Sequence, residues 1–251
     1  MKKVSALKLP FYISDASFQL PDRLCASTWL EHIPFAFWLT EALKPKLFVE
    51  LGTYFGASYF AFCQEIQRNR TDCKCYAIDT WKGDEHSGYY EDHVFHSVRE
   101  HNQKKYPSFS TLIRSTFDDS IQYFEDATID LLHIDGFHTY EEVKGDFGKW
   151  LPKLSSTAVV LFHDINVKEK DFGVYKLWEE LKQEYRYFDF FHGYGLGVLA
   201  VGKTFPPALN DLFSLGAESK TTDFVRRYFS RLGSGINYLF LYEDQVRSTK
   251  Q

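Results

Sequence analysis

Four residues with side chains suited to chemistry come directly after two buried apolar runs. Asp135 and His138 follow the first run, and His163 and Asp164 follow the second. Because the carboxyl ends of parallel strands meet at one edge of a sheet, we expect these side chains to converge. Two carboxylates and a neutral imidazole suit an octahedral divalent ion such as magnesium, so Asp135, His163 and Asp164 are the candidate ligands. Such an ion would lower the pKa of a bound hydroxyl and position it.

The candidate general base is His138, which lies three residues after the first acid of this group. Imidazole has a suitable pKa near neutrality for taking a proton from a hydroxyl. Its rivals are His86 and His192. Ordinary structural roles remain open as well: His163 as a buried histidine bonded to backbone, and Asp164 as a turn residue.

A glycine turn after another buried strand is the candidate cofactor site. Residues 47–51 form a short apolar run that ends at Gly52, and Gly56 opens a helical pattern over residues 57–66. Glycines at such a turn let the backbone approach a ligand, and the free amides at the helix start favour electron-rich groups. Glu50 adds a carboxylate beside the turn. The alternative is that both glycines serve packing alone.

The next predicted strand, residues 73–79, ends in Asp79, which is placed to accept hydrogen bonds from ribose hydroxyls. Tyr54 departs from the dinucleotide pattern G-x-G-x-x-G and leaves less room for a pyrophosphate. The loop after Asp79 is polar and aromatic. Trp81 is expected to pack on an adenine or cap the pocket, and Asp84, His86, Tyr89 and Tyr90 to meet a polar substrate. A surface loop is the alternative.

Strands alternate with helices along the chain, which predicts a doubly wound α/β sheet. The predicted strands are 47–51, 73–79, 108–114, 129–134, 157–162, 187–191 and 196–201, the last two antiparallel. The predicted helices are 29–43, 57–66, 92–104, 118–124, 140–151 and 172–185. After Pro206-Pro207 we expect two or three further helices, including 222–232 and 236–246, separated by Gly233 and Gly235.

Composition limits the function classes. The chain has 251 residues, 44% of them hydrophobic, and a net charge of −5, which gives no basic footprint for nucleic acid. No apolar run reaches the roughly 20 residues of a membrane span, and no secretory signal is expected. The four cysteines predict reduced packing residues in a cytoplasmic protein.

The form E-x-G-x-x-x-G with a strand-end acid resembles the S-adenosylmethionine (SAM) site of class I methyltransferases. Ile134-Asp-Gly-Phe-His-Thr-Tyr140 with Phe162-His-Asp164 is similar to the macrocin-type, metal-dependent sugar O-methyltransferases, although His163 stands where that family has an acid. The resemblance implies a Rossmann-like seven-stranded sheet of order 3-2-1-4-5-7-6, with the last strand antiparallel, helices on both faces and added terminal helices. It also implies SAM contacts at Glu50, Gly52, Gly56 and Asp79, adenine contacts near Ser115, Thr116 and Phe117, and catalytic roles for Asp135 and His138. We add Thr53, Thr80 and Trp81, which lie next to these positions, to the expected cofactor set.

Three regions follow: a helical cap (1–45), the methyltransferase domain (46–204) and a helical extension (205–251). The expected function is SAM-dependent O-methylation of a sugar or polysaccharide hydroxyl, on a small-molecule or glycan acceptor. The aromatic faces of the extension predict packing on the domain or on a second subunit. The alternative of another class is a non-catalytic SAM-fold module that binds a nucleotide or a partner.

Overall fold

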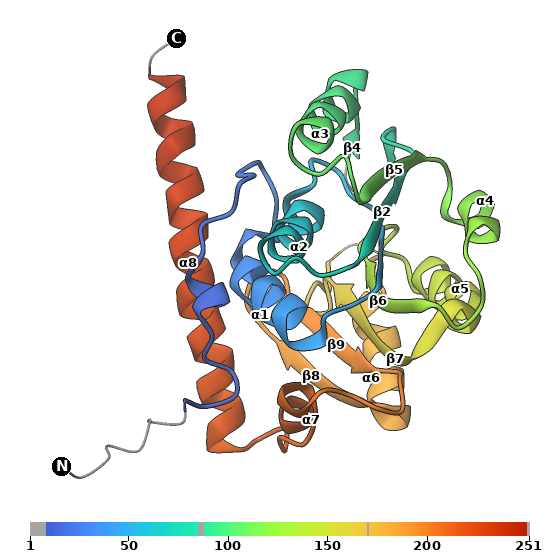
Figure 1. Cartoon of the computed structure of the whole chain (residues 1–251), viewed down its shortest axis with the longest axis vertical. Helices are drawn as coiled ribbons and strands as arrows, with labels where there is room; N and C mark the ends of the chain where they lie inside the picture. Colours follow the sequence, from blue (N-terminus) through green and yellow to red (C-terminus); the bar gives the residue numbers. More distant parts are fainter. Residues whose placement is uncertain (1–8, 85–87, 170, 250–251) are drawn as a thin grey trace.

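A twisted seven-stranded sheet forms the middle layer of the molecule, with helices on both faces (Figure 1). The structure is a computed structural model that describes residues 9–84, 88–169 and 171–249. The sheet strands are β1 (Leu47–Leu51), β2 (Lys74–Asp79), β5 (Ser110–Arg114), β6 (Ile129–Ile134), β7 (Leu154–His163), β8 (Arg186–Phe190) and β9 (Leu196–Ala200). Their order, β5-β2-β1-β6-β7-β9-β8, is the predicted 3-2-1-4-5-7-6 when they are numbered along the chain.

Pairing within the sheet confirms the predicted mixed topology. All neighbouring strands from β5 to β7 are parallel, whereas β9 is antiparallel to both β7 and β8. Strands buried on both faces read as continuous apolar runs, because each successive side chain enters one of two cores. Phe48 accordingly packs in one core and Val49 in the other.

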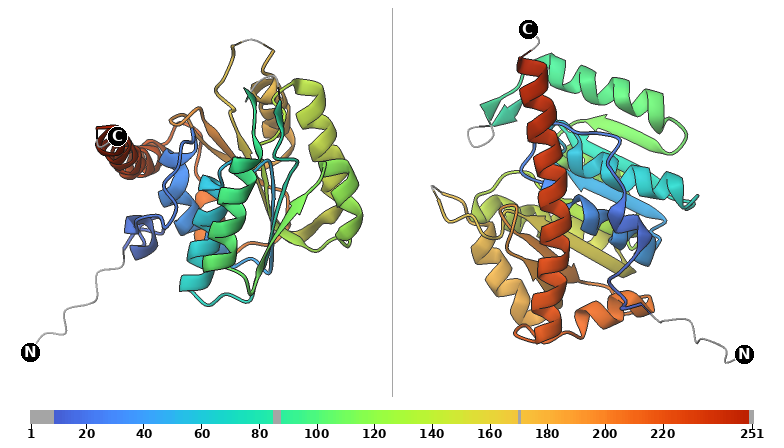
Figure 2. Two further views of the ribbon diagram at one scale, coloured as in Figure 1. Left: turned by 90° about the horizontal axis from the view of Figure 1, so that it is seen from above. Right: turned by 90° about the vertical axis from the view of Figure 1, so that its left-hand side faces the viewer.

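The two cores correspond to the two helical layers seen in Figure 2. Helices α1 (Ile33–Leu43), α2 (Ala57–Arg68), α3 (Asp92–Lys105), α7 (Pro207–Phe213) and α8 (Lys220–Ser248) contribute to the first. Helices α5 (Tyr140–Trp150) and α6 (Val174–Glu184) contribute to the second, beside the short α4 (Phe117–Ser120). The expected loop after β2 contains a two-stranded ribbon, β3 (Gly83–Asp84) and β4 (Gly88–Tyr89). Among the described residues, none of the helices combines the length and apolarity needed to cross a bilayer.

The C-terminal extension differs from its prediction. One helix, α8, runs unbroken over 29 residues, so the prediction of separate helices divided by Gly233 and Gly235 is wrong. Gly233 has a packing role instead, since a Cβ there would come within 1.9 Å of the Glu31 carbonyl oxygen. A glycine inside a helix costs only about 1 kcal/mol, which the close contact with residues Leu30–His32 offsets.

Two other helices have different bounds from those that the sequence pattern predicts. The helix expected over residues 29–43 starts as a 3₁₀ turn, and its α-helical part begins at Ile33, with Pro34 in its first turn. The helix expected over 118–124 is the four-residue α4 followed by a 3₁₀ turn, Ile121–Tyr123.

Candidate active site

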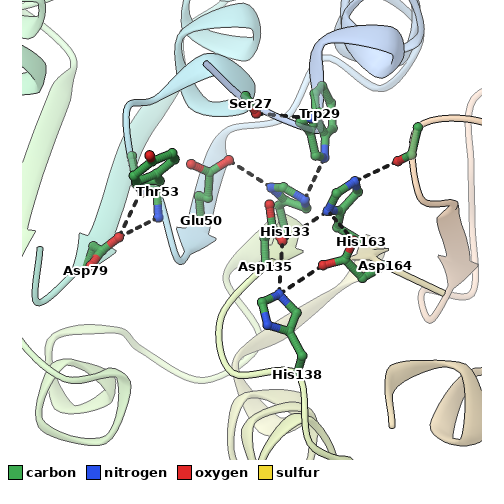
Figure 3. Close-up of polar contacts among 12 residues, drawn as sticks. Ser27, Trp29, Glu50, Thr53, Asp79, His133, Asp135, His138, His163 and Asp164 are labelled. Carbon is green, nitrogen blue, oxygen red and sulfur yellow. Dashed lines mark hydrogen bonds and ion pairs between the residues drawn. The ribbon is translucent and has the colours of Figure 1, made fainter. Parts of the chain in front are cut away.

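A cavity of about 1060 Å³ lies at the carboxyl ends of the parallel strands. Its wall includes the glycine turn after β1, the loop after β6 and the residue that follows β7. It therefore joins the two groups of residues that the sequence singles out, the cofactor turn and the acid–imidazole group (Figure 3). This is the position at which open α/β sheets bind ligands.

Backbone geometry explains both glycines of the turn. Gly52 has φ +87°, and a Cβ there would lie 2.1 Å from the carbonyl oxygen of Asp135. Gly56 has φ +82° and precedes the first residue of α2. The turn thus adopts a conformation that side chains resist, and at Gly52 it touches the backbone of the acid after β6.

The carboxylate of Asp79 holds the glycine turn from the neighbouring strand. Its Oδ2 accepts hydrogen bonds from the amides of Thr53 (2.8 Å) and Tyr54 (3.0 Å). Its Oδ1 accepts from the amide of Trp81 (2.6 Å). Asp79 also lines the cavity, so the acid predicted to meet a ribose serves first to shape the turn.

Glu50 is fully buried and contacts a histidine that the sequence reasoning did not select. The Glu50 Oε2 atom lies 2.8 Å from His133 Nδ1, while His133 Nε2 lies 3.1 Å from the indole nitrogen of Trp29. Because an indole N–H only donates, Nε2 accepts and Nδ1 carries the proton. Burial raises the pKa of Glu50, and the His133 hydrogen bond opposes this. Glu50 does not line the cavity, and its contact with a cofactor stays a prediction.

The remaining predicted cofactor residues divide between the cavity wall and the interior. Thr53, Thr80, Thr116 and Phe117 line the cavity. The assignment of Trp81 to the cavity is corrected, whereas that of Ser115 stays a prediction. Trp81 is fully buried, donates its indole N–H to the Tyr54 carbonyl (2.9 Å) and packs against Phe95. Ser115 lies outside the wall and donates its amide to the Asp79 carbonyl (3.1 Å).

The acid–imidazole group forms a compact cluster. His138 Nε2 lies 2.9 Å from Asp164 Oδ2 and 3.9 Å from Asp135 Oδ1. One ligand atom from each of these three residues lies within 4.8 Å of the others, a spacing at which they could hold a metal ion. Phe172 stacks on the imidazole ring at a centroid distance of 4.6 Å, which fixes its plane.

His163 lies behind the two carboxylates and is not part of this three-residue group. Its Nδ1 is 3.2 Å from Asp135 Oδ1 and 3.3 Å from Asp164 Oδ1. Its Nε2 is 3.0 Å from the Gly193 carbonyl oxygen. Both ring nitrogens face acceptors and must donate, so neither has a lone pair for a metal. The geometry corrects the prediction that His163 is a ligand.

Opposite charges within the cluster shift the pKa values of its carboxylates and histidines in opposite directions. Burial alone would lower the pKa of His138, but hydrogen bonds to Asp135 and Asp164 raise it to about 9. Burial likewise opposes protonation of His163, whereas the two carboxylates raise its pKa well above the usual value. Burial favours the neutral acid at Asp135, yet the His163 charge holds its pKa well below normal.

Comparison with known proteins assigns the central part of the chain. Residues 49–165 match the model of the family described as "Methyltransferase domain". This segment, a little under half of the chain, is similar to that family. It begins within β1 and ends just beyond β7, so it contains the glycine turn, Asp79 and the whole acid–imidazole cluster.

Three further proteins are similar to longer parts of the chain. The chain is 44% identical over 207 residues to an uncharacterized protein, y4gI, of Sinorhizobium fredii, covering 82% of this chain but only 23% of that protein. A putative O-methyltransferase from Klebsiella pneumoniae superposes with a TM-score of 0.51 at 17% identity, covering 73% of this chain and 84% of that one. The SAM-bound O-methyltransferase TomG from Streptomyces achromogenes gives 0.50 at 15% identity, with coverages of 72% and 83%. At these identities the two structures establish the shared fold.

Several residues of the cavity wall were missed from the sequence. Tyr54, Phe172 and Tyr194 line the cavity but come from three separate loops. Only the His-Gly-Tyr-Gly turn after β8 carried a signal, because Gly193 and Gly195 both adopt positive φ angles that favour glycine. Of the rival bases, His192 lies outside the cavity wall, with its pKa lowered by burial to about 4. His86 lies outside the described residues.

Proposed function

We propose that the protein is a SAM-dependent O-methyltransferase that transfers a methyl group to a hydroxyl of a sugar or polysaccharide. The observation that carries this proposal is the shared cavity. The glycine turn of the methyltransferase domain and the His138 cluster open into one space, and the Gly52 backbone touches that of Asp135. A methyl donor in the turn would thus lie next to a group able to accept a proton.

SAM binding is supported by the turn and by the structural neighbour that holds it. TomG carries SAM in its structure. In this chain the same role would fall to the turn from Gly52 to Gly56, with Thr116 and Phe117 along the adenine side. Thr116 caps α4 by accepting a hydrogen bond from the Asp119 amide (3.1 Å), which orders this wall.

The chemistry is an in-line displacement. The acceptor oxygen bonds to the methyl carbon as the carbon–sulfur bond breaks, and S-adenosylhomocysteine leaves. The hydroxyl proton passes to the imidazole of His138 in the fraction of molecules that a pKa of about 9 leaves neutral. Asp164 would orient that imidazole, and Asp135 would accept a hydrogen bond from the acceptor. Alignment supplies much of the rate, and a positioned base contributes about 10²–10⁴-fold.

The acceptor class is inferred from the chemistry of the wall. Tyr54, Tyr90, Phe172 and Tyr194 offer aromatic surfaces, and Asp135 and Asp164 offer carboxylates. Aromatic faces pack on the apolar faces of pyranose rings, and carboxylates accept bonds from hydroxyls. A sugar unit satisfies both requirements at once.

A divalent ion is proposed as a further component. The carboxylates of Asp135 and Asp164 fit the preference of magnesium for oxygen, and both lie in the only three-residue cluster that meets metal-ligand spacing among the described residues. Such an ion would supply positive charge that orients the acceptor oxygen and lowers the pKa of its hydroxyl. Because His138 shares the same carboxylates, the ion and the imidazolium proton would compete for them.

The location proposed is the cytoplasm. All four cysteines are free thiols, and three of them are buried. Unpaired cysteines are usual in a reducing compartment.

Isothermal titration with SAM and S-adenosylhomocysteine, followed by methyl-transfer assays over glycan acceptors, tests the function. We expect binding of both nucleosides and transfer to at least one hydroxylated acceptor. Binding without transfer to any acceptor would favour a non-catalytic module, and absence of binding would refute the proposal.

A further inference from the structure

Helix α8 carries an exposed stripe along the side facing away from the domain. We define the α8 stripe as Phe224, Arg227, Arg231, Ser234, Gly235, Tyr238, Leu241, Tyr242 and Gln245, all of which are exposed. Its large apolar members are unusually open, with Tyr238 73%, Tyr242 59% and Leu241 56% exposed. The opposite side of the helix, with Val225, Phe229 and Ile236, is buried. The right-hand view of Figure 2 shows α8 lying across the front of the molecule.

Two small residues lie at the centre of this stripe. A Cβ at Gly235 would meet nothing within 4 Å, in contrast to Gly233, whose Cβ would strike the Glu31 carbonyl. Glycine inside a helix costs about 1 kcal/mol relative to alanine, and contacts within the described chain do not offset that cost at Gly235. Gly148 in α5 is equally open, so openness alone does not mark a contact. Gly235 differs from Gly148 because it lies beside Ser234 at the centre of the α8 stripe, where small residues allow another backbone to approach.

The stripe is complementary to itself when reversed. If a second α8 runs antiparallel with its centre at Ser234 and Gly235, Arg231 lies opposite Tyr238 of the second copy. Arg227 then lies opposite Tyr242 of the second copy. Each pairing occurs twice, as a two-fold axis requires. An arginine over a tyrosine ring is attractive, and it is the kind of pair that is enriched in protein interfaces.

Charge also favours the reversed arrangement. The basic members of the α8 stripe, Arg227 and Arg231, both lie in its first half, where Arg227 is paired with Asp223 (2.8 Å). A parallel pair would set these arginines against the same arginines of the second copy, whereas an antiparallel pair sets them against its aromatic half. We propose that the α8 stripe is a two-fold interface between two copies of this chain.

Cysteine cross-linking tests the arrangement. In the proposed dimer the two Ser234 positions lie next to the axis, whereas the two Lys220 positions lie at opposite ends of the helix pair. Under mild oxidation we expect Ser234→Cys to form a disulfide-linked dimer and Lys220→Cys to remain unlinked like the parent. Equal linking of both variants, or of neither, would overturn the antiparallel arrangement.

Sedimentation equilibrium on the full chain provides the second measurement. We expect a parent dimer, and a dissociation constant raised about tenfold by Arg231→Glu, which removes two symmetric arginine–tyrosine contacts. Gly235→Leu should abolish the dimer while leaving the helical circular dichroism and thermal midpoint intact. Gly148→Leu, at an open glycine of α5, should leave the dimer unchanged. A parent that is monomeric up to its solubility limit would refute the interface, as would a dimer indifferent to Gly235→Leu.

Discussion

The contact between Gly52 and Asp135 makes one substitution informative about both halves of the cavity. In a Gly52→Ala variant the new Cβ would lie 2.1 Å from the Asp135 carbonyl oxygen and 2.6 Å from its carbonyl carbon. An ordinary carbon–oxygen contact requires a separation about 1 Å greater, so the two backbones must move apart. The φ of +87° also has to be retained by a residue with a side chain.

The expected loss of stability in Gly52→Ala is the sum of a backbone cost and a steric cost. A left-handed conformation at alanine costs about 1–2 kcal/mol, and overpacking a tight contact costs about 1–3 kcal/mol. The sum, about 2–5 kcal/mol, is smaller than the typical stability of a domain, about 5–15 kcal/mol, so the variant should fold. Moving Asp135 by about 1 Å should lower the rate of the chemical step by about 10²-fold.

Three measurements separate these consequences. Urea unfolding gives the loss of stability, titration with SAM gives the loss of affinity, and single-turnover methyl transfer gives the loss of rate. Gly145→Ala is the matched control, because Gly145 also lines the cavity but has nothing within 4 Å of a new Cβ. It should bind SAM like the parent and be as stable or more so. Parent-like affinity and rate in folded Gly52→Ala would refute the proposed coupling of the turn and the cluster.

Three further outcomes are expected. His138→Ala should lower kcat by about 10²–10⁴-fold with little change in SAM affinity. The control His96→Ala, at an exposed histidine of α3, should leave both quantities unchanged. The kcat/KM of the parent should rise with pH towards the His138 pKa of about 9. Removal of divalent ions should reduce turnover if Asp135 and Asp164 hold one, and full activity in metal-free protein would eliminate that role. Burial lowers the pKa of His192 to about 4, so as the pH falls below about 6.5 this histidine is protonated in the unfolded chain before it is protonated in the folded one. Between pH 7.5 and 5 the free energy of unfolding, measured in urea, should therefore fall by about 2 kcal/mol more in the parent than in His192→Phe.

The fold was predictable because its signals are local. Buried parallel strands such as β1 and β6 are continuous apolar runs, and their loops begin at glycine or aspartate. Helix α8 was divided in the prediction because a glycine usually signals a break. Gly233 is needed for a neighbour, Glu31, that lies about 200 residues away in the sequence, and a single sequence does not display such a contact.

The site was predictable in its residue types and less so in their roles. Asp135, His138 and Asp164 converge because their strands are adjacent, which topology alone implies. The direction of each side chain depends on distant partners. His163 faces the Gly193 carbonyl of the β8–β9 turn, and Glu50 faces His133, so neither lies free on the cavity wall.

The bonds from the turn amides to Asp79 have a thermodynamic consequence. An anion supplied by the protein already fixes the turn before any cofactor arrives, since its carboxylate accepts from the amides of Thr53, Tyr54 and Trp81. A preorganised loop loses little conformational entropy when its ligand binds. SAM should therefore associate rapidly in a single kinetic step, with affinity differences among variants of the turn expressed mainly in the dissociation rate.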